Sequence, residues 1–302
     1  MTLFRALTVM LTCALPLAAV AQETLPDQIP ELAPDLQPDM VPAPEQPLDL
    51  EEPPQMALDE AQVVFLGEQH DNPGHHARQA ELVAELQPVA LVFEMLTAEQ
   101  AARVTPDLRA DAAALAEALG WADSGWPDFS MYHPIFTAAP EAVIYGAQMP
   151  REEARAVRDA SPAEVFGQSA GFYGLDQPLP PEQQAAREEL QRAAHCDALP
   201  PDMLPMMVNI QRLRDARLAE VALEAWAEHG GPVVVITGNG HARADWGAPA
   251  LLRFAAPEVS VAALGQGETG RGAPEGRFDA LEESAPVDRG DPCAEFEAPE
   301  GN

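Results

Sequence analysis

Short, nearly continuous apolar runs recur along the middle of the chain and alternate with longer amphipathic stretches. The runs are rich in β-branched residues, which is typical of strands that are buried on both faces of a sheet. They lie at residues 62–67, 89–94, 142–147, 232–238 and 259–264. This pattern predicts a sheet that is covered by other elements on both sides.

The stretches between the runs have the apolar spacing and composition of helices. The predicted helices lie at residues 74–86, 98–119, 181–194 and 204–228. A helix between two buried strands has the length of a right-handed crossover, so the strands that it joins run parallel. We therefore predict an α/β fold with a largely parallel sheet flanked by helices. The segment 97–135, which ends in an aromatic loop at 120–134, is predicted to form a small helical lid-like subdomain.

Both ends of the chain differ from this predicted domain at 58–265. Residues 1–21 combine an apolar run with a small-residue cleavage pattern, which predicts a signal peptide. A lipid anchor on Cys13 is the weaker alternative. Residues 22–57 are rich in proline and acidic residues and predict a disordered tether. Residues 266–302 read as an acidic C-terminal tail.

The charge of the chain narrows the classes of partner. The formal net charge is −32, from 49 acidic and 17 basic residues, and none of the basic residues is a lysine. Such a charge repels nucleic acids and anionic membrane surfaces, so neither is an expected partner. The predicted signal peptide places the protein in the periplasm or outside the cell.

Cleavage of the signal peptide leaves two cysteines, Cys196 and Cys293. In an oxidising compartment two cysteines predict one disulfide, which would pin the C-terminal tail to the domain. Two free thiols remain the alternative at this stage.

Polar side chains follow the predicted strands at their carboxyl ends. Glu68 and His70 follow the first strand, Glu94 ends the second, and His241 follows the fourth after a Gly-Asn-Gly turn. Arg151 comes shortly after the third strand. Because the carboxyl ends of parallel strands meet at one edge of a sheet, we expect these residues to share a site.

Two kinds of chemistry fit this set of residues. Imidazole and carboxylate groups are ligands of zinc or manganese, so Glu68, His70, Glu94 and His241 are candidate metal ligands. Without a metal, a glutamate could act as general base and a histidine as general acid. The Glu-x-His spacing is much less specific than a His-Glu-x-x-His helix, so both options stay open.

Two longer motifs carry a resemblance to a known family. Gly67-Glu68-Gln69-His70-Asp71-Asn72-Pro73, followed by His75-His76, and Gly238-Asn239-Gly240-His241-Ala242-Arg243 resemble the ChaN-like haem-binding uptake proteins. That family is related to the erythromycin esterase and TraB/Tiki group. The resemblance covers roughly residues 58–264, and the two motifs are specific only together.

The resemblance implies an α/β protein that binds haem for iron uptake, with haem held between two subunits of a homodimer. It also implies an outer-membrane haem transport system as a partner. Haem requires an axial donor, apolar walls and cations for its propionates. The candidate donors are Tyr132, His70 and His241, with Tyr132 first because tyrosinate suits ferric haem. The candidate walls are Trp121, Trp126, Phe129 and Met149, and the candidate propionate partners are Arg151 and Arg243.

A different function is implied by the related esterase and protease groups, which resemble this chain at matching Glu and His positions. In that case Glu68, His70, Glu94 and His241 would be catalytic residues of a hydrolase, with or without a metal. An acidic adaptor that acts through its proline-rich tether is a third interpretation. The strand-end polar cluster favours a binding or catalytic site over this third interpretation.

Overall fold

The computed structural model describes residues 55–291 and 293–294. The predicted signal peptide and residues 22–54 of the predicted tether lie outside the described residues. No helix within the described part of the chain is long and apolar enough to cross a membrane.

A six-stranded sheet with strand order β3-β2-β4-β1-β5-β6 forms the centre of the described chain. Its strands are β1 (Val63–Glu68), β2 (Ala90–Phe93), β3 (Val143–Gly146), β4 (Val233–Gly238), β5 (Val261–Glu268) and β6 (Ala280–Ser284). Every neighbouring pair is parallel, so all carboxyl ends lie at one edge. The predicted α/β fold with a parallel sheet is confirmed.

Helices fill the connections between the strands. The longer helices are α1 (Pro73–Leu86), α4 (Ala112–Leu119), α5 (Phe129–Ala138), α8 (Pro181–Ala194), α9 (Leu204–His229) and α11 (Ala248–Ala255). Short helices are α2 (Ala98–Ala101), α3 (Pro106–Arg109), α6 (Arg151–Arg155), α7 (Pro162–Phe166) and α10 (Asn239–Ala242). Turns of 3-10 helix lie at Leu58–Glu60, Trp121–Asp123, Ala156–Arg158, Ala170–Tyr173 and Pro201–Met203.

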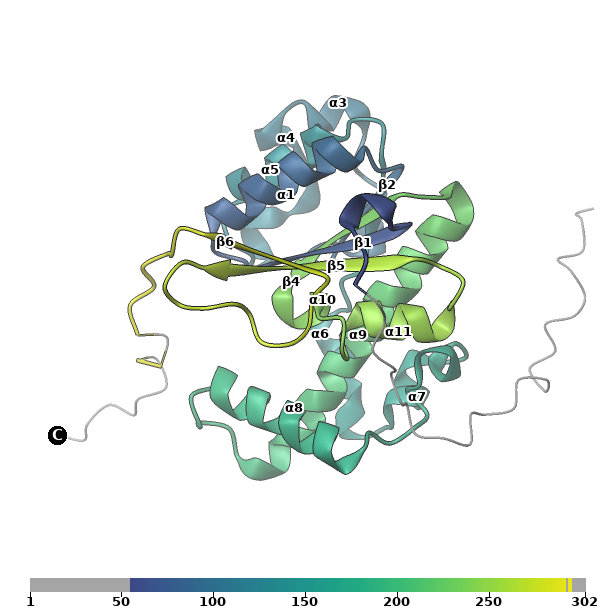
Figure 1. Cartoon of the computed structure of the whole chain (residues 1–302), viewed down its shortest axis with the longest axis vertical. Helices are drawn as coiled ribbons and strands as arrows, with labels where there is room; N and C mark the ends of the chain where they lie inside the picture. Colours follow the sequence, from purple (N-terminus) through teal and green to yellow (C-terminus); the bar gives the residue numbers. More distant parts are fainter. Residues whose placement is uncertain (1–54, 292, 295–302) are drawn as a thin grey trace, which may run out of the picture. The chain divides into compact units, whose positions relative to one another are not determined.

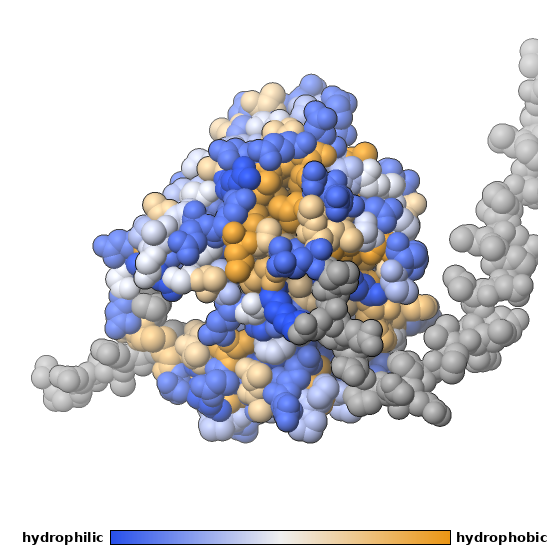
Figure 2. All heavy atoms as spheres, in the orientation of Figure 1, coloured by the Kyte–Doolittle hydropathy of each residue, from blue (hydrophilic) through white to orange (hydrophobic). Residues whose placement is uncertain are grey.

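The two faces of the sheet carry different side chains because successive strand residues point to opposite sides. Val63 and Phe65 of β1 face the layer that contains α9 and α11, whereas Val64 and Leu66 face the layer that contains α1 and α5. Figure 1 shows these layers on opposite sides of the sheet. In Figure 2 apolar side chains gather in the middle of the visible face, between hydrophilic surfaces above and below. Full burial of a valine, leucine or phenylalanine side chain stabilises a fold by roughly 1.5–3 kcal/mol.

The turn between β1 and α1 has the local structure that its sequence favours. Asn72 caps α1, and its side-chain oxygen accepts a hydrogen bond from the backbone N–H of Gly74 at 2.8 Å. Pro73 occupies the first helical turn, where its missing N–H costs nothing. This cap fixes the residues between β1 and α1 at the edge of the sheet.

Residues 129–134 are helical, although the sequence predicts an irregular loop there. They begin α5, which contains Pro134 in its interior. Proline usually disfavours a helix interior, so the local pattern was misleading. Packing stabilises the helix instead, since the rings of Phe93 and Phe136 stack with their centroids 4.3 Å apart.

The region predicted as an acidic tail continues the fold. β5 extends to Glu268, and β6 adds a parallel edge strand after it. The residues of β6 alternate between half-buried and exposed. Its sequence does not alternate between apolar and polar residues, because Glu282 and Glu283 are consecutive. Arg78 on α1 contacts Glu282 at 2.7 Å and so holds β6 through its side chains.

Candidate functional site

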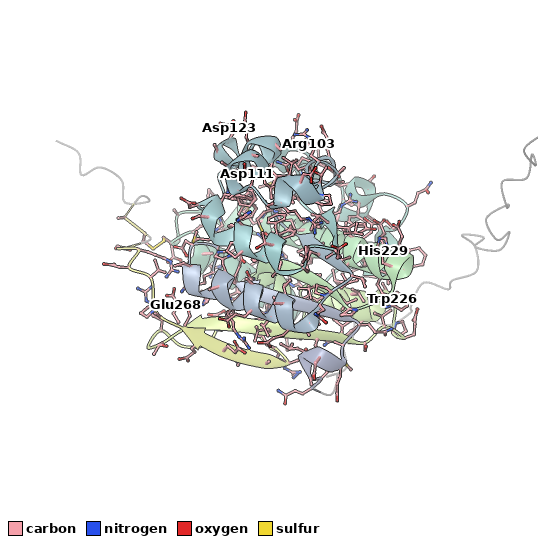
Figure 3. All side chains as sticks on the ribbon, turned by 90° about the horizontal axis from the view of Figure 1, so that it is seen from above. Arg103, Asp111, Asp123, Trp226, His229 and Glu268 are labelled. Carbon is pink, nitrogen blue, oxygen red and sulfur yellow. A yellow bond between two sulfur atoms is a disulfide. The ribbon has the colours of Figure 1, made fainter. Side chains whose placement is uncertain are left out.

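The carboxyl ends of β1, β2 and β4 bring together four residues that the sequence analysis singled out: Glu68, His70, Glu94 and His241. Gly238 lies between them, because a Cβ atom there would be 2.9 Å from His70 Nε2 and 3.8 Å from Glu94 Oε2. Only glycine leaves room for this approach. Figure 3 labels Glu268 at this end of the sheet, whereas Trp226 and His229 lie at the opposite end.

A buried carboxylate positions His70. Oε1 of Glu68 accepts hydrogen bonds from His70 Nδ1–H at 2.8 Å and from the Tyr132 hydroxyl at 3.0 Å. His76 Nδ1 lies 3.3 Å from the other oxygen of Glu68, and His76 Nε2–H donates to the backbone carbonyl of His70 at 2.8 Å. Both the ring and the backbone of His70 are therefore held in place.

The second ring nitrogen of His70, Nε2, lies close to Gly238. Among the described residues Nε2 of His70 has no hydrogen-bond partner, and 35% of the side chain is exposed. The ring edge contacts Trp126, with ring centroids 4.9 Å apart. Burial lowers the pKa of His70, but the hydrogen bond to Glu68 and the nearby charge of Glu94 outweigh burial and raise the pKa to about 9.

The side chain of His241 is largely buried. Its Nδ1–H donates to Asp215 on α9 at 2.6 Å, and its Nε2 lies 3.8 Å from Glu94 Oε1. Burial lowers the pKa of His241, but Glu94 and Asp215 outweigh burial and raise the pKa. His241 therefore lies between two carboxylates that both favour its protonated form.

Glu94 is ionised within this buried group. Its Oε2 accepts hydrogen bonds from the Thr237 hydroxyl at 2.6 Å and from the Gly238 N–H at 2.8 Å. Burial raises the pKa of a carboxyl group, but His241, His70 and these hydrogen bonds outweigh burial and lower the pKa of Glu94 to about 2.

A cavity of about 920 Å³ opens beside His70. This volume lies in the range of ligand pockets. Its lining includes His70, His241 and Arg214, with apolar surface from Leu190, Val208 and Trp246. The cavity thus combines an open imidazole with apolar walls and a cation.

A second cavity of about 210 Å³ is lined by Glu94, Trp126, Met149, Arg151 and Arg214. Arg214 borders both cavities. Within the described chain, the guanidinium groups of Arg151 and Arg214 make no hydrogen bond or ion pair. Arg214 lies on the polar face of α9 but was not assigned to the site from the sequence.

Tyr132, the first axial donor predicted from the sequence, is fully buried and lines neither cavity. Burial and the negative charge of Glu68 raise the pKa of its hydroxyl far above the ordinary value, so tyrosinate is disfavoured. Trp121 and Phe129 pack around it in the core rather than forming walls of the cavity. This placement argues against an axial role for Tyr132.

Arg243 lines the larger cavity, but its guanidinium is already paired. It donates to both carboxylate oxygens of Asp245, at 2.7 and 2.6 Å, and lies 3.5 Å from the centre of the Trp246 ring. Arg151 and Arg214 are better placed than Arg243 to bind a new anion.

The predicted metal set needs a correction. Among the described residues no group of three or more His, Cys, Asp or Glu side chains is arranged to hold a metal ion. Glu68 and His70 hydrogen-bond each other, and Glu94 and His241 are turned toward Thr237, Gly238 and Asp215. The four residues are close together, but in this arrangement they do not form such a group.

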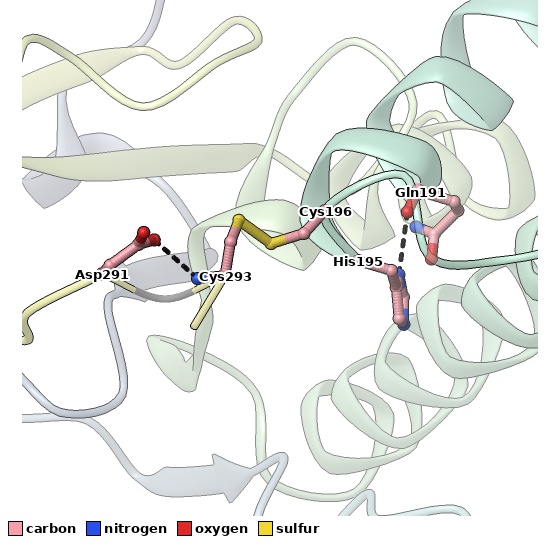
Figure 4. Close-up of a disulfide and its surroundings, with 5 residues drawn as sticks. All are labelled: Gln191, His195, Cys196, Asp291 and Cys293. Carbon is pink, nitrogen blue, oxygen red and sulfur yellow. Dashed lines mark hydrogen bonds between the residues drawn. A yellow bond between two sulfur atoms is a disulfide. The ribbon is translucent and has the colours of Figure 1, made fainter. Parts of the chain in front are cut away.

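Cys196 and Cys293 form a disulfide, with Cα atoms 5.5 Å apart and a separation of 97 positions in sequence. Figure 4 shows that it joins the loop after α8 to the C-terminal segment. Asp291 accepts a hydrogen bond from the Cys293 N–H at 2.8 Å beside it.

The chain is similar to solved structures of known proteins, and the first of them shares its fold. A ChaN protein of Campylobacter jejuni, described with cofacially bound haem, is 21% identical; the match covers 69% of this chain and 82% of that chain with a TM-score of 0.56. The type III effector HopBA1 is 15% identical, over 76% of this chain and 90% of its own, with a TM-score of 0.42. No curated protein sequence matches the chain significantly.

The family model described as "Haem-binding uptake, Tiki superfamily, ChaN" matches residues 56–252. This range contains both sequence motifs and the groups that contact the His70 and His241 side chains, namely Glu68, Glu94, Trp126 and Asp215. The match spans well over half of the 302 residues, and the fold agrees with it. By these two findings the chain belongs to the ChaN family of haem-binding uptake proteins.

Proposed function

We propose that this chain binds haem in the larger cavity, with the iron coordinated by Nε2 of His70. The observation that carries this proposal is the pairing of His70, a residue that lines this cavity: its Nδ1–H is bound to Glu68, and its Nε2 has no hydrogen-bond partner among the described residues. A carboxylate on the outer nitrogen is the usual support of a metal-ligating histidine, because it fixes the ring and increases its basicity. Glycine at 238 leaves the space that Nε2 needs.

The surroundings of His70 supply the other groups that haem requires. Trp126 contacts the His70 ring, and Leu190, Val208 and Trp246 add apolar wall. The guanidinium groups of Arg214 and Arg151 would pair with the propionates, because they make no ion pair within the described chain. When bound, haem supplies an iron centre whose properties depend on this axial ligand.

A titration of the purified protein with ferric haem tests this proposal. We expect a saturable shift of the Soret band at one haem per chain, and a weaker shift in Arg214→Ala. His229→Ala, at the opposite end of the sheet, is the matched control and should bind like the wild type. A Soret band that stays at the position of free haem would contradict the proposal.

The proposal includes a location and partners. The disulfide supports a location outside the cytoplasm, since thiols in the cytoplasm are kept reduced. The Campylobacter protein is described with cofacial haem. By analogy, two copies of this chain would form a homodimer around a pair of haems and exchange them with an outer-membrane transport system. Sedimentation with and without haem would detect the dimer, and a monomer at saturating haem would exclude it.

A hydrolase is the second candidate function. His70 is protonated at neutral pH and open to the cavity, as a general acid must be, and Glu94 is ionised nearby. A screen of ester and amide substrates on haem-free protein, with His70→Gln and Glu94→Gln as controls, tests this function. Turnover lost in both variants would support a hydrolase, and its absence across the screen would leave haem binding as the function.

A further inference from the structure

Helix α8 forms one wall of the larger cavity and has little packing to hold it. Leu190 and Gln191 of α8 line the cavity, but Arg187 is the one residue of the helix that is buried. Arg187 lies 3.9 Å from Asp215 and donates to the backbone carbonyl of Trp246 at 3.2 Å. A helix with so little apolar burial depends on other connections for its position.

One such connection is the segment after β6, residues 285–291 and Cys293, which we call the strap. Figure 1 shows this segment running from the sheet toward the end of α8. At one end Arg289 donates to both oxygens of Asp71, at 2.5 and 2.7 Å, and contacts Glu268 at 2.7 Å. At the other end Cys293 is bonded to Cys196, just after α8.

The strap therefore joins two walls of the cavity. Asp71 follows His70 directly and lines the cavity, as do Arg289 of the strap and Leu190 of α8. The disulfide is the covalent link in this connection, and Figure 4 shows it between the strap and the loop after α8. If this bond opens, α8 still has its packing against α9 and the contacts of Arg187 with Asp215 and Trp246, but it loses its covalent link to the strap.

Two features make this bond responsive to reductants. Cys196 and Cys293 are both only half-buried, so a small thiol can reach them. In addition, Cys196 and Asp197 are consecutive non-glycine residues with left-handed backbone, at φ values of 54° and 57°. That conformation is unfavourable for such residues, so the loop gains freedom when the bond is cut.

The strap also lies beyond the region that the family model describes. The match ends at residue 252, so β6, Arg289 and Cys293 are not part of it. The connection between α8 and the sheet is therefore a feature of this chain that membership of the family does not supply.

We propose that the Cys196–Cys293 disulfide is a redox latch that holds α8 and the strap together beside the ligand cavity, and that its reduction lets them separate and widens the cavity. The reductant is a dithiol: one of its thiolates attacks a sulfur of the disulfide, and its second thiol completes the exchange. The products are two protein thiols and the oxidised, cyclic disulfide of the reductant. The inference of ligand release rests on the proposed function; the movement of α8 does not.

Hydrogen exchange on the full haem-free chain tests the latch itself. The oxidised protein is compared with protein that has been reduced by a dithiol and alkylated, and with the Cys196→Ser/Cys293→Ser variant. We expect the amides of α8 to exchange at least about tenfold faster in both, while amides of β1 and β4 stay protected. Unchanged exchange in α8 would overturn the latch, and so would loss of protection in the central strands, which would indicate general unfolding.

Dissociation of ferric haem into an excess of a haem-scavenging protein tests the consequence. Haem should leave the alkylated protein and the double variant at least about tenfold faster than the oxidised protein. Equal rates would overturn the gating role even if α8 moves. If the chain binds no haem at all, the proposed function fails, whereas the exchange measurement still decides on the latch.

Discussion

His70 and His241 occupy equivalent places at the ends of the adjacent parallel strands β1 and β4, yet their surroundings differ. Each imidazole donates from Nδ1 to a buried carboxylate, Glu68 in one case and Asp215 in the other. Both residues line the larger cavity, but Nε2 of His241 lies 3.8 Å from Glu94 Oε1, whereas Nε2 of His70 has no hydrogen-bond partner among the described residues. One histidine is thus part of a closed charge network, and the other keeps a free donor atom.

This difference shows that the Gly-Glu-Gln-His and Gly-Asn-Gly-His motifs do not by themselves define the roles of their histidines. What decides the role is the group that lies opposite the second ring nitrogen. For His241 that group is Glu94, which comes from a different strand. For His70 it is Gly238, which has no polar side chain to pair with Nε2 and no Cβ atom to displace the ring. We therefore expect structural consequences from changes at His241 and consequences for binding from changes at His70.

The largest expected effect is on stability and comes from the substitution of His241. His241→Ala leaves Asp215 and Glu94 as buried charges without their partner, which should destabilise the fold by about 3–5 kcal/mol. Urea denaturation followed by circular dichroism measures this loss. The folded fraction should still bind haem with nearly wild-type affinity; loss of haem binding without loss of stability would reverse the roles given to the two histidines.

Substitution of His70 should affect haem affinity more than stability. In His70→Ala the affinity for ferric haem should fall by about 100-fold or more, because loss of a supporting partner alone costs about 10–100-fold at metal sites. The urea midpoint should fall less than in His241→Ala, because the ring is partly exposed and Glu68 keeps its hydrogen bond from Tyr132. Haem titration and denaturation of the same preparation give both numbers. A large drop in stability with intact haem affinity would contradict the comparison.

The raised pKa of His70 predicts how haem binding depends on pH. Nε2 must lose its proton before it can coordinate iron, so affinity should rise about tenfold per pH unit below pH 9 and level off above it. The contribution of the His70–Glu68 pair to the stability of the fold has the opposite dependence on pH. The pair stabilises the fold fully below the ordinary pKa of 6.5 and loses this effect as the pH rises through 9. Haem affinity that falls between pH 7 and 9 would contradict this account.

The smallest expected effect is that of Tyr132→Phe, which tests whether Tyr132 takes part in haem binding. Tyr132→Phe keeps the ring packing and removes one hydrogen bond to Glu68, which should cost about 1 kcal/mol of stability. Haem affinity and the ferric spectrum should stay close to those of the wild type. A spectral change as large as that in His70→Ala would restore Tyr132 as the axial ligand.

The sequence predicted the sheet well because its strands are buried on both faces and therefore have continuous apolar runs. It did not predict β6, whose residues are half-exposed and acidic, or the helical start of α5, which contains Pro134. Edge strands and proline-containing helices depend on tertiary packing, and local patterns do not report it.

The candidate site was predictable in part for a similar reason. Parallel topology brings Glu68, His70, Glu94 and His241 to one edge, so strand ends are enough to group them. Asp215 and Arg214 lie in the middle of α9, where a helix of ordinary amphipathic appearance gives no sign of a site. Tyr132 looked like a ligand because of its chemistry, but only burial shows that it is a hydrogen-bond donor to Glu68.

The most direct test of the central claim is the ferric haem spectrum of His70→Gly with and without added imidazole. If His70 Nε2 is the axial ligand, the variant should lose the wild-type Soret position and recover it when imidazole occupies the vacated space. His241→Gly should show no such response to imidazole. A wild-type spectrum in His70→Gly without imidazole would contradict the assignment of His70 as the ligand.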